Sequence, residues 1–213
     1  RFFLPPKQEL ADFQRTRRPL VTLESQTPVS EFDVVALSVS FEWDYVNVLT
    51  LLRLCGLPFR AAERNHRHPL VVIGGAVTFV NPEPLALFAD AIAAGEGELL
   101  VPSLCQTMRE ATSRRDLLER LSRERGYYIP SFYEPRYDEN GVLASYDVSS
   151  DAPFPVRKAA VKTTDALDPP ATRIFTPDTE FGSRFLIEVV RGCANLCRFC
   201  WAGYKYLPVC SFP

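Results

Sequence analysis

Apolar runs alternate with amphipathic stretches through the first half of the chain. Residues 33–40 form an apolar run that predicts a buried parallel strand, and residues 45–54 then carry apolar side chains at helical spacing. The same order is repeated by four further segments, which predict strand, helix, strand and helix: 69–75, 82–85, 89–94 and 95–108. Strands that alternate with helices predict an α/β domain with a doubly wound parallel sheet.

The strand ends of this sheet are candidate ligand contacts, because ligands of doubly wound sheets bind beyond the carboxyl ends of the strands. Five residues of the predicted strand ends form this candidate rim: Ser38, Gly74, Gly75, Glu96 and Gly97. Glycine allows close approach of a ligand to the backbone. The alternative interpretation is that these positions are structural turns only.

The middle of the chain has a different pattern. Residues 114–125 predict an amphipathic helix that ends at Gly126, and residues 127–146 place β-rich runs on both sides of Asn140-Gly141, which predicts a hairpin. Residues 151–182 are rich in Pro, Thr and Asp and predict an extended linker.

Three cysteines lie close together near the end of the chain. Residues 185–190 read as a buried strand, and the chain then turns into Cys193, Cys197 and Cys200 at CxxxCxxC spacing. Three thiolates on one loop can hold three irons of a [4Fe-4S] cluster and leave the fourth iron open to another ligand.

This loop resembles the signature of the radical SAM superfamily, CxxxCxΦC, in which Phe199 fills the aromatic position. The resemblance implies that the preceding strand is the first strand of a (β/α) barrel. It also implies that the cluster on the three cysteines binds S-adenosylmethionine and cleaves it reductively to a 5′-deoxyadenosyl radical, with Phe199 against the adenine. The electrons would come from a donor such as a flavodoxin or ferredoxin, and the substrate is unknown.

Two alternatives remain open for the cysteines. Together with Cys210 they could form a non-catalytic structural zinc site, since zinc favours four thiolate or imidazole ligands. The chain could instead be a corrinoid-binding or interaction domain with a vestigial cysteine loop. A disulfide is disfavoured, because no secretory segment is visible.

The first half resembles the cobalamin-binding-type (B12-binding-like) domain found in one branch of radical SAM proteins. The similarity rests on GGAVTFVNPEP and GEGE, with Ala76 in place of the usual proline. The resemblance implies that residues 1–4 are the second strand of such a domain and that its first strand is missing. No Asp-x-His-x-x-Gly is present to bind cobalt, and His66 and His68 lie in a polar turn. The missing first strand and its loop would carry this motif, so cobalamin stays an open but unsupported cofactor.

Composition is that of a globular protein with a sizeable core. The chain has 213 residues, 46% of them hydrophobic, and a formal net charge of −2. It has no apolar run near the roughly 20 residues that span a bilayer and no basic stripe, so we expect a cytoplasmic protein without membrane or nucleic-acid partners. It does not begin with Met, so we expect a fragment of a longer enzyme, inactive by itself.

These observations predict three segments. Residues 1–126 form an incomplete flavodoxin-like (Rossmann-like) domain with a doubly wound parallel sheet, and residues 127–182 form a β-hairpin and linker. Residues 183–213 contain the first strand of a radical SAM barrel with its cluster loop.

Overall fold

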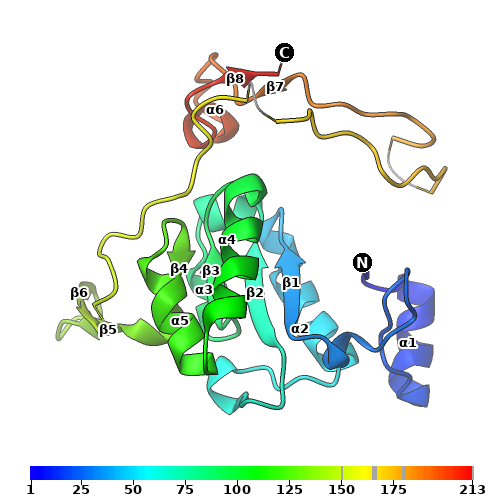
Figure 1. The fold of residues 1–213 in the computed structure, drawn as a ribbon, viewed down its shortest axis with the longest axis horizontal. Coiled ribbons are helices and arrows are strands. Elements are labelled where there is room, and N and C mark those ends of the chain that lie inside the picture. The colour runs from blue at the N-terminus through cyan, green and yellow to red at the C-terminus, as the bar shows by residue number, and fades with distance from the viewer. Residues whose placement is uncertain (150, 165–166, 179–180, 213) are drawn as a thin grey trace. The chain divides into compact units, whose positions relative to one another are not determined.

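The computed structural model describes residues 1–149, 151–164, 167–178 and 181–212, and it consists of two compact units (Figure 1). The first unit comprises residues 1–159 and the second residues 160–213.

The first unit is built on a four-stranded sheet of order β1-β2-β3-β4. Its strands are β1 (Val34–Ser38), β2 (Leu70–Gly74), β3 (Ala91–Ala93) and β4 (Tyr127–Tyr128). The first three strands are parallel, with Val35 opposite Val71 and Ile73 opposite Ile92. The prediction of an α/β domain with a parallel sheet is thus confirmed; the flavodoxin-like subtype stays a prediction.

β4 is an antiparallel edge strand that the sequence pattern did not assign to this sheet. Gly126, at φ +96°, reverses the chain before β4, and its carbonyl accepts a hydrogen bond from Ala94 N at 2.7 Å. A Cβ at this position would lie 2.8 Å from the Leu100 side chain, so only glycine fits the reversal.

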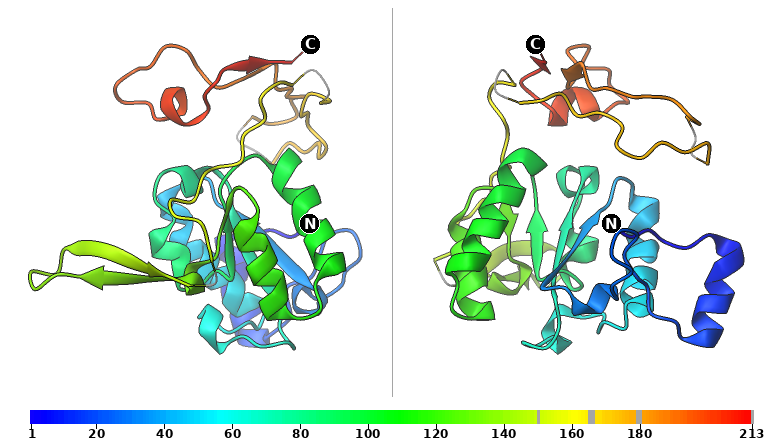
Figure 2. Two further views of the ribbon diagram at one scale, coloured as in Figure 1. Left: turned by 60° about the vertical axis from the view of Figure 1, so that its left-hand side comes forward. Right: turned by 45° about the vertical axis from the view of Figure 1, so that its right-hand side comes forward.

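Helices cover both faces of the sheet. Val71 and Ile73 pack in one apolar cluster with α2, whereas Leu70 and Val72 pack in a second cluster with α4 and α5 (Figure 2). This alternation explains why β2 is a continuous apolar run. The α-helices of the first unit are α1 (Lys7–Thr16), α2 (Tyr45–Leu54), α3 (Glu83–Ala86), α4 (Gly97–Glu110) and α5 (Arg114–Arg123). Its 3₁₀ turns are η1 (Val29–Glu31), η2 (Glu42–Asp44), η3 (Ala61–Glu63), η4 (Ala76–Phe79) and η5 (Pro130–Phe132).

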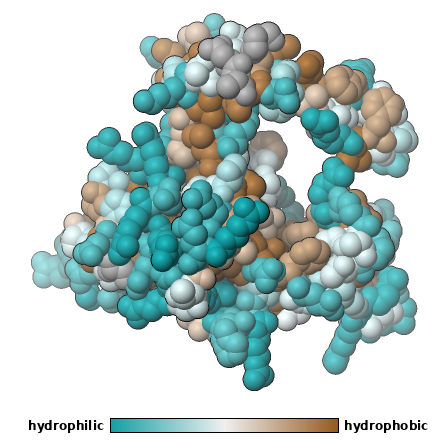
Figure 3. All heavy atoms as spheres, viewed as in Figure 1, coloured by the Kyte–Doolittle hydropathy of each residue, from teal (hydrophilic) through white to brown (hydrophobic). Residues whose placement is uncertain are grey.

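The outer face of α5 matches its amphipathic pattern. Leu121 is fully buried, whereas Arg115 and Glu119 pair at the surface through Nε and Oε1 at 2.8 Å. Figure 3 shows hydrophilic residues over much of the face that carries α4 and α5.

The predicted hairpin is present as β5 (Tyr133–Tyr137) and β6 (Leu143–Val148), which pair antiparallel. In the turn, Asp138 Oδ1 accepts hydrogen bonds from the backbone N–H groups of Asn140 and Val142 at 2.9 and 2.8 Å. The hairpin extends away from the sheet (Figure 2, left).

The prediction that residues 1–4 form a strand is wrong. They have no strand pairing; Phe2 and Leu4 instead pack partly buried against the core, and the Arg1 carbonyl accepts a hydrogen bond from Leu23 N at 2.7 Å. Among the described residues, β1 is therefore an edge of the sheet.

The second unit has little regular structure: β7 (Val190–Arg191) pairs antiparallel with β8 (Cys210–Ser211), and α6 (Ala202–Lys205) is one turn long. The prediction of a buried strand over residues 185–190 is wrong for this structure: Ile187 forms an isolated antiparallel bridge with Ala171, and Val190 belongs to the antiparallel pair of β7 and β8. The apolar side chains of this segment are exposed: Phe185, Leu186, Ile187, Val189 and Val190. The barrel strand is therefore not confirmed.

Within the described residues, no helix is long and apolar enough to cross a bilayer.

Candidate functional site

The cysteine loop begins at a position that only glycine can occupy. Gly192 follows β7 at φ +93°, and a Cβ there would lie 2.1 Å from the carbonyl oxygen of Tyr206. The chain thus enters the loop in close contact with the segment that follows α6.

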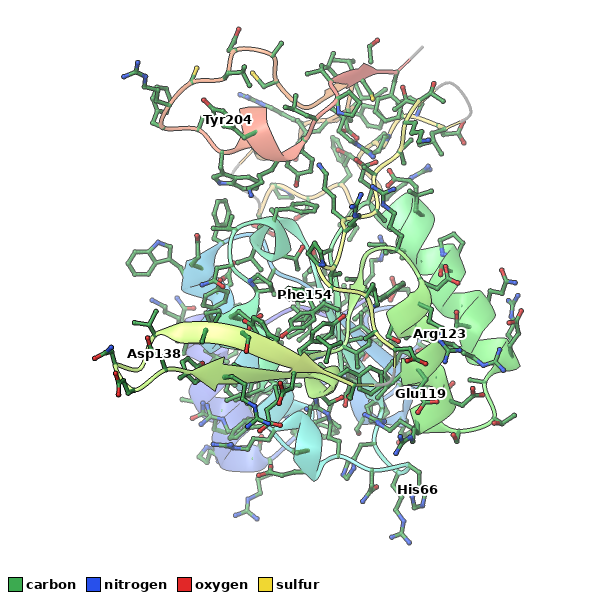
Figure 4. All side chains as sticks on the ribbon, turned by 90° about the vertical axis from the view of Figure 1, so that its left-hand side faces the viewer. His66, Glu119, Arg123, Asp138, Phe154 and Tyr204 are labelled. Carbon is green, nitrogen blue, oxygen red and sulfur yellow. The ribbon has the colours of Figure 1, made fainter. Side chains whose placement is uncertain are left out.

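α6 holds the loop from the other side. The Tyr204 hydroxyl donates a hydrogen bond to the Leu196 carbonyl at 2.7 Å, and Tyr204 is labelled in Figure 4. Gly203 lies so close that a Cβ would be 3.3 Å from Leu196 Cα and 3.4 Å from the Cys193 carbonyl oxygen. Cys200 N donates to the Cys197 carbonyl at 3.0 Å. The loop is therefore folded back on the helix that follows it.

The three loop thiols are half-exposed and free. No disulfide forms at Cys193, Cys197 or Cys200, nor at Cys210 on β8, whose Sγ lies 3.5 Å from the Pro208 carbonyl oxygen. Within the described ranges, no three His, Cys, Asp or Glu side chains are grouped so that they could hold a metal ion. The number, chemistry and exposure of the loop thiols fit a [4Fe-4S] cluster, although the structure does not bring them together.

Phe199 is 92% exposed between two of the cysteines. An exposed ring at this place is available to a ligand, so its contact with adenine stays a prediction.

An ion pair that the sequence analysis did not identify stabilises the entry to the loop. Arg191 donates to both carboxylate oxygens of Glu188, with Nε–Oε1 at 3.0 Å and Nη2–Oε2 at 2.7 Å, and its guanidinium lies 5.4 Å from the Phe212 ring centroid. The signal in the sequence was a carboxylate in an otherwise apolar run, three residues before the arginine that precedes Gly192.

Part of the predicted rim is brought together at the ends of β1 and β2. Ser38 is exposed and lies opposite Gly74 in the parallel register. Gly75 follows at φ +94°, and a Cβ there would lie 2.5 Å from the Val39 carbonyl oxygen. Gly75 is thus required by the packing of two strand ends, which supports the alternative that it is a structural turn.

The rest of the rim, at the end of β3, is contacted by the chain itself. Ala159 forms a parallel bridge with Gly95, and its carbonyl accepts a hydrogen bond from Glu96 N at 3.0 Å. Gly97 is exposed and begins α4. The chain around Ala159 therefore covers the carboxyl end of β3, and Ser38 and Glu96 do not line one open site.

The two histidines of the chain lie at the opposite end of the sheet. His66 and His68 belong to the turn that precedes the amino end of β2, and His66 is labelled in Figure 4. Neither can reach a cobalt ion at the carboxyl ends of the strands, so the donor set of this chain does not fit a histidine-ligated cobalamin.

Comparison with known proteins identifies the first unit. The family described as radical SAM proteins, N-terminal, matches residues 1–130. The chain belongs to this family. The match to the radical SAM N-terminal family ends before the cysteine loop, so it does not cover Cys193, Cys197 and Cys200.

One curated relative is an uncharacterized protein of Methanocaldococcus jannaschii, 25% identical over 186 residues. The alignment covers 87% of this chain and 34% of that protein, so the chain spans about a third of its length. No solved structure matches the chain.

Proposed function

We propose that Cys193, Cys197 and Cys200 hold a [4Fe-4S] cluster in the whole protein, and that the protein is a radical SAM enzyme. When bound, such a cluster would supply one electron to the sulfonium of S-adenosylmethionine, whose S–C5′ bond would then break to give methionine and a 5′-deoxyadenosyl radical. The substrate is not identified by this chain. The observation that carries the proposal is a loop of three free, half-exposed thiols in a chain of the radical SAM N-terminal family.

The chain's own residues have separate parts in this function. Gly192 and α6 hold the backbone of the loop, and the Glu188–Arg191 ion pair stabilises its entry. Phe199 is exposed and offers an apolar surface to the adenine of S-adenosylmethionine.

The family relationship and the parallel sheet support a B12-binding-like fold for the first unit. Cobalamin itself is not part of the proposal, because both histidines lie at the far end of the sheet. Free thiols and a low-potential cluster suit the reducing cytoplasm, with a flavodoxin or ferredoxin as the electron donor.

The test is anaerobic reconstitution of the whole protein with iron and sulfide. We expect about four irons per chain, visible absorption, and after dithionite a low-temperature EPR signal that S-adenosylmethionine perturbs. Cys197→Ala should abolish iron binding.

Cys210→Ala is the matched control, because Cys210 is equally free but lies on β8. A cluster with three protein ligands keeps its iron in this variant. A colourless protein that binds stoichiometric zinc and loses it in both variants would contradict the proposal and establish the structural zinc site instead.

A further inference from the structure

An aromatic cavity of about 210 Å³ lies in the first unit, at the junction of the sheet and the hairpin. β3 and η4 contribute Ile92 and Thr78 to it, and it also lies beside the start of α3. None of the residues discussed for the cysteine loop lines it. We call it the aromatic cavity and define it by its lining: Thr78, Pro82, Glu83, Ile92, Ala94, Tyr128, Tyr133, Tyr146, Phe154, Pro155 and Val156.

Four aromatic rings from separate elements surround the cavity. Tyr128 of β4 meets Tyr133 of β5 edge to face, with ring centroids 5.0 Å apart, and Tyr146 of β6 meets Phe154 at 5.8 Å. Tyr133 is buried and its hydroxyl donates to the Pro153 carbonyl at 2.7 Å, whereas Phe154 is 64% exposed. Figure 4 shows Phe154 beside the hairpin. One wall of the cavity is thus buried, and the other reaches solvent.

The charge of the cavity is negative. Among the described residues that line it, Glu83 is the one charged side chain. Burial raises the pKa of Tyr128, and the nearby Glu83 carboxylate raises it further. Burial, followed by the same carboxylate, raises the pKa of Tyr146. The exposed Glu83 carboxylate therefore raises the pKa of two tyrosines of the cavity, Tyr128 and Tyr146.

Rings and a carboxylate together select for charge as well as for apolar surface. The negative faces of aromatic rings attract an organic cation, and methyl groups on the cation fill the apolar space between the rings. The volume corresponds to roughly seven water molecules, which suits a small alkylated head group.

We propose that the aromatic cavity binds the quaternary ammonium head group of a small molecule, with Tyr128, Tyr133, Tyr146 and Phe154 around the cation and Glu83 at the mouth. This site is independent of the cysteine loop, and its test uses no cluster.

The test compares choline with its neutral carbon isostere, 3,3-dimethylbutan-1-ol, by calorimetric titration of the full chain. The two ligands have nearly the same shape, so their difference isolates the charge. We expect choline to bind at least about tenfold more tightly, and tetramethylammonium to compete with it. Equal affinity for the isostere would overturn the proposal.

Two variants with matched controls locate the site. Glu83→Gln should weaken choline about fivefold and leave the isostere unchanged, whereas Glu134→Gln, on β5 and outside the cavity, should change neither. Tyr146→Leu should abolish selectivity for choline, whereas Tyr146→Phe, which keeps the ring, should retain it.

Tyr137→Leu changes an exposed ring of the same hairpin and controls for loss of hairpin stability. Unchanged choline binding in both Glu83→Gln and Tyr146→Leu would overturn the proposal. If Tyr146→Leu does not fold, Glu83→Gln decides alone, because Glu83 is exposed.

Discussion

A buried ion pair at the amino ends of β2 and β3 provides the sharpest test of what stabilises the first unit. The Arg64 side chain is 0% exposed and its Nε lies 3.0 Å from Asp90 Oδ2, which also accepts a hydrogen bond from Val71 N at 2.8 Å. Arg114 approaches the other oxygen of Asp90 at 2.8 Å. Asp90 therefore links the residue after η3 with β2 and α5, and we predict that Asp90→Ala strongly destabilises the unit.

The magnitude follows from the groups that lose their partner. Arg64 keeps its hydrogen bonds to the carbonyls of Pro58, Phe59 and Phe88, but its buried charge loses the counterion. Breaking a buried pair on one side costs roughly 3–5 kcal/mol, and the orphaned Val71 N–H adds to this less than additively. We expect a loss of about 4 kcal/mol in the free energy of unfolding.

Urea unfolding followed by circular dichroism at 222 nm measures this loss. The signal reports the first unit, because every described helix longer than one turn belongs to it. With a slope of roughly 2 kcal/mol per molar urea, the midpoint should fall by about 2 M. Asp147→Ala, which removes an exposed pair with Arg136, should shift the midpoint little.

The double variant Arg64→Met with Asp90→Ala refines the test. It has no buried charge at position 64, so its loss in the free energy of unfolding should be smaller than the sum of the losses in the two single variants. A midpoint for Asp90→Ala within about 0.3 M of the unchanged protein would refute the reasoning.

The other predictions concern the loop glycine and a buried thiol. Gly192→Ala should prevent cluster assembly in the whole protein, because its Cβ would overlap the Tyr206 carbonyl; Gly182→Ala has a similar φ of +61° but open space around its Cβ and should retain its iron content. Equal iron in both variants would show that the close contact is not needed. Burial raises the pKa of the Cys55 thiol from 9.0 to about 12, so iodoacetamide at pH 8 should alkylate the half-exposed loop cysteines and spare Cys55, as read by mass spectrometry. The same pKa shift should lower the free energy of unfolding as the pH rises from 9 towards 12, because the unfolded chain loses the Cys55 thiol proton at a lower pH than the folded protein. If the free energy of unfolding of a Cys55→Ala variant depended on pH in the same way, this prediction would be wrong.

Single helices and turns could be predicted, because residues close together in the sequence determine them. The apolar spacing of residues 45–54 predicted a helix with the bounds that α2 has, and Asn140-Gly141 predicted the hairpin turn. The loop thiols were likewise found from spacing alone. These signals depend on residues a few positions apart, which a short stretch of chain contains in full.

Burial could not be predicted in the same way. Residues 185–190 have the composition of a buried strand, yet their side chains are exposed, because burial needs neighbours from elsewhere in the chain. The resemblance to a B12-binding-like domain implied a strand at residues 1–4, yet Phe2 and Leu4 pack against the core and residues 1–4 form no strand pairing.

The sequence by itself determined the α/β class, the helix and strand periods, and the set of thiols that suits an iron-sulfur cluster. Only the tertiary structure decided which distant groups meet. Asp90 meets Arg64 across 26 positions, and the aromatic cavity combines rings of β4, β5, β6 and the following linker with a carboxylate of α3. The physical reason is that periodicity states which side of an element is apolar, whereas contacts between elements depend on how their faces pack.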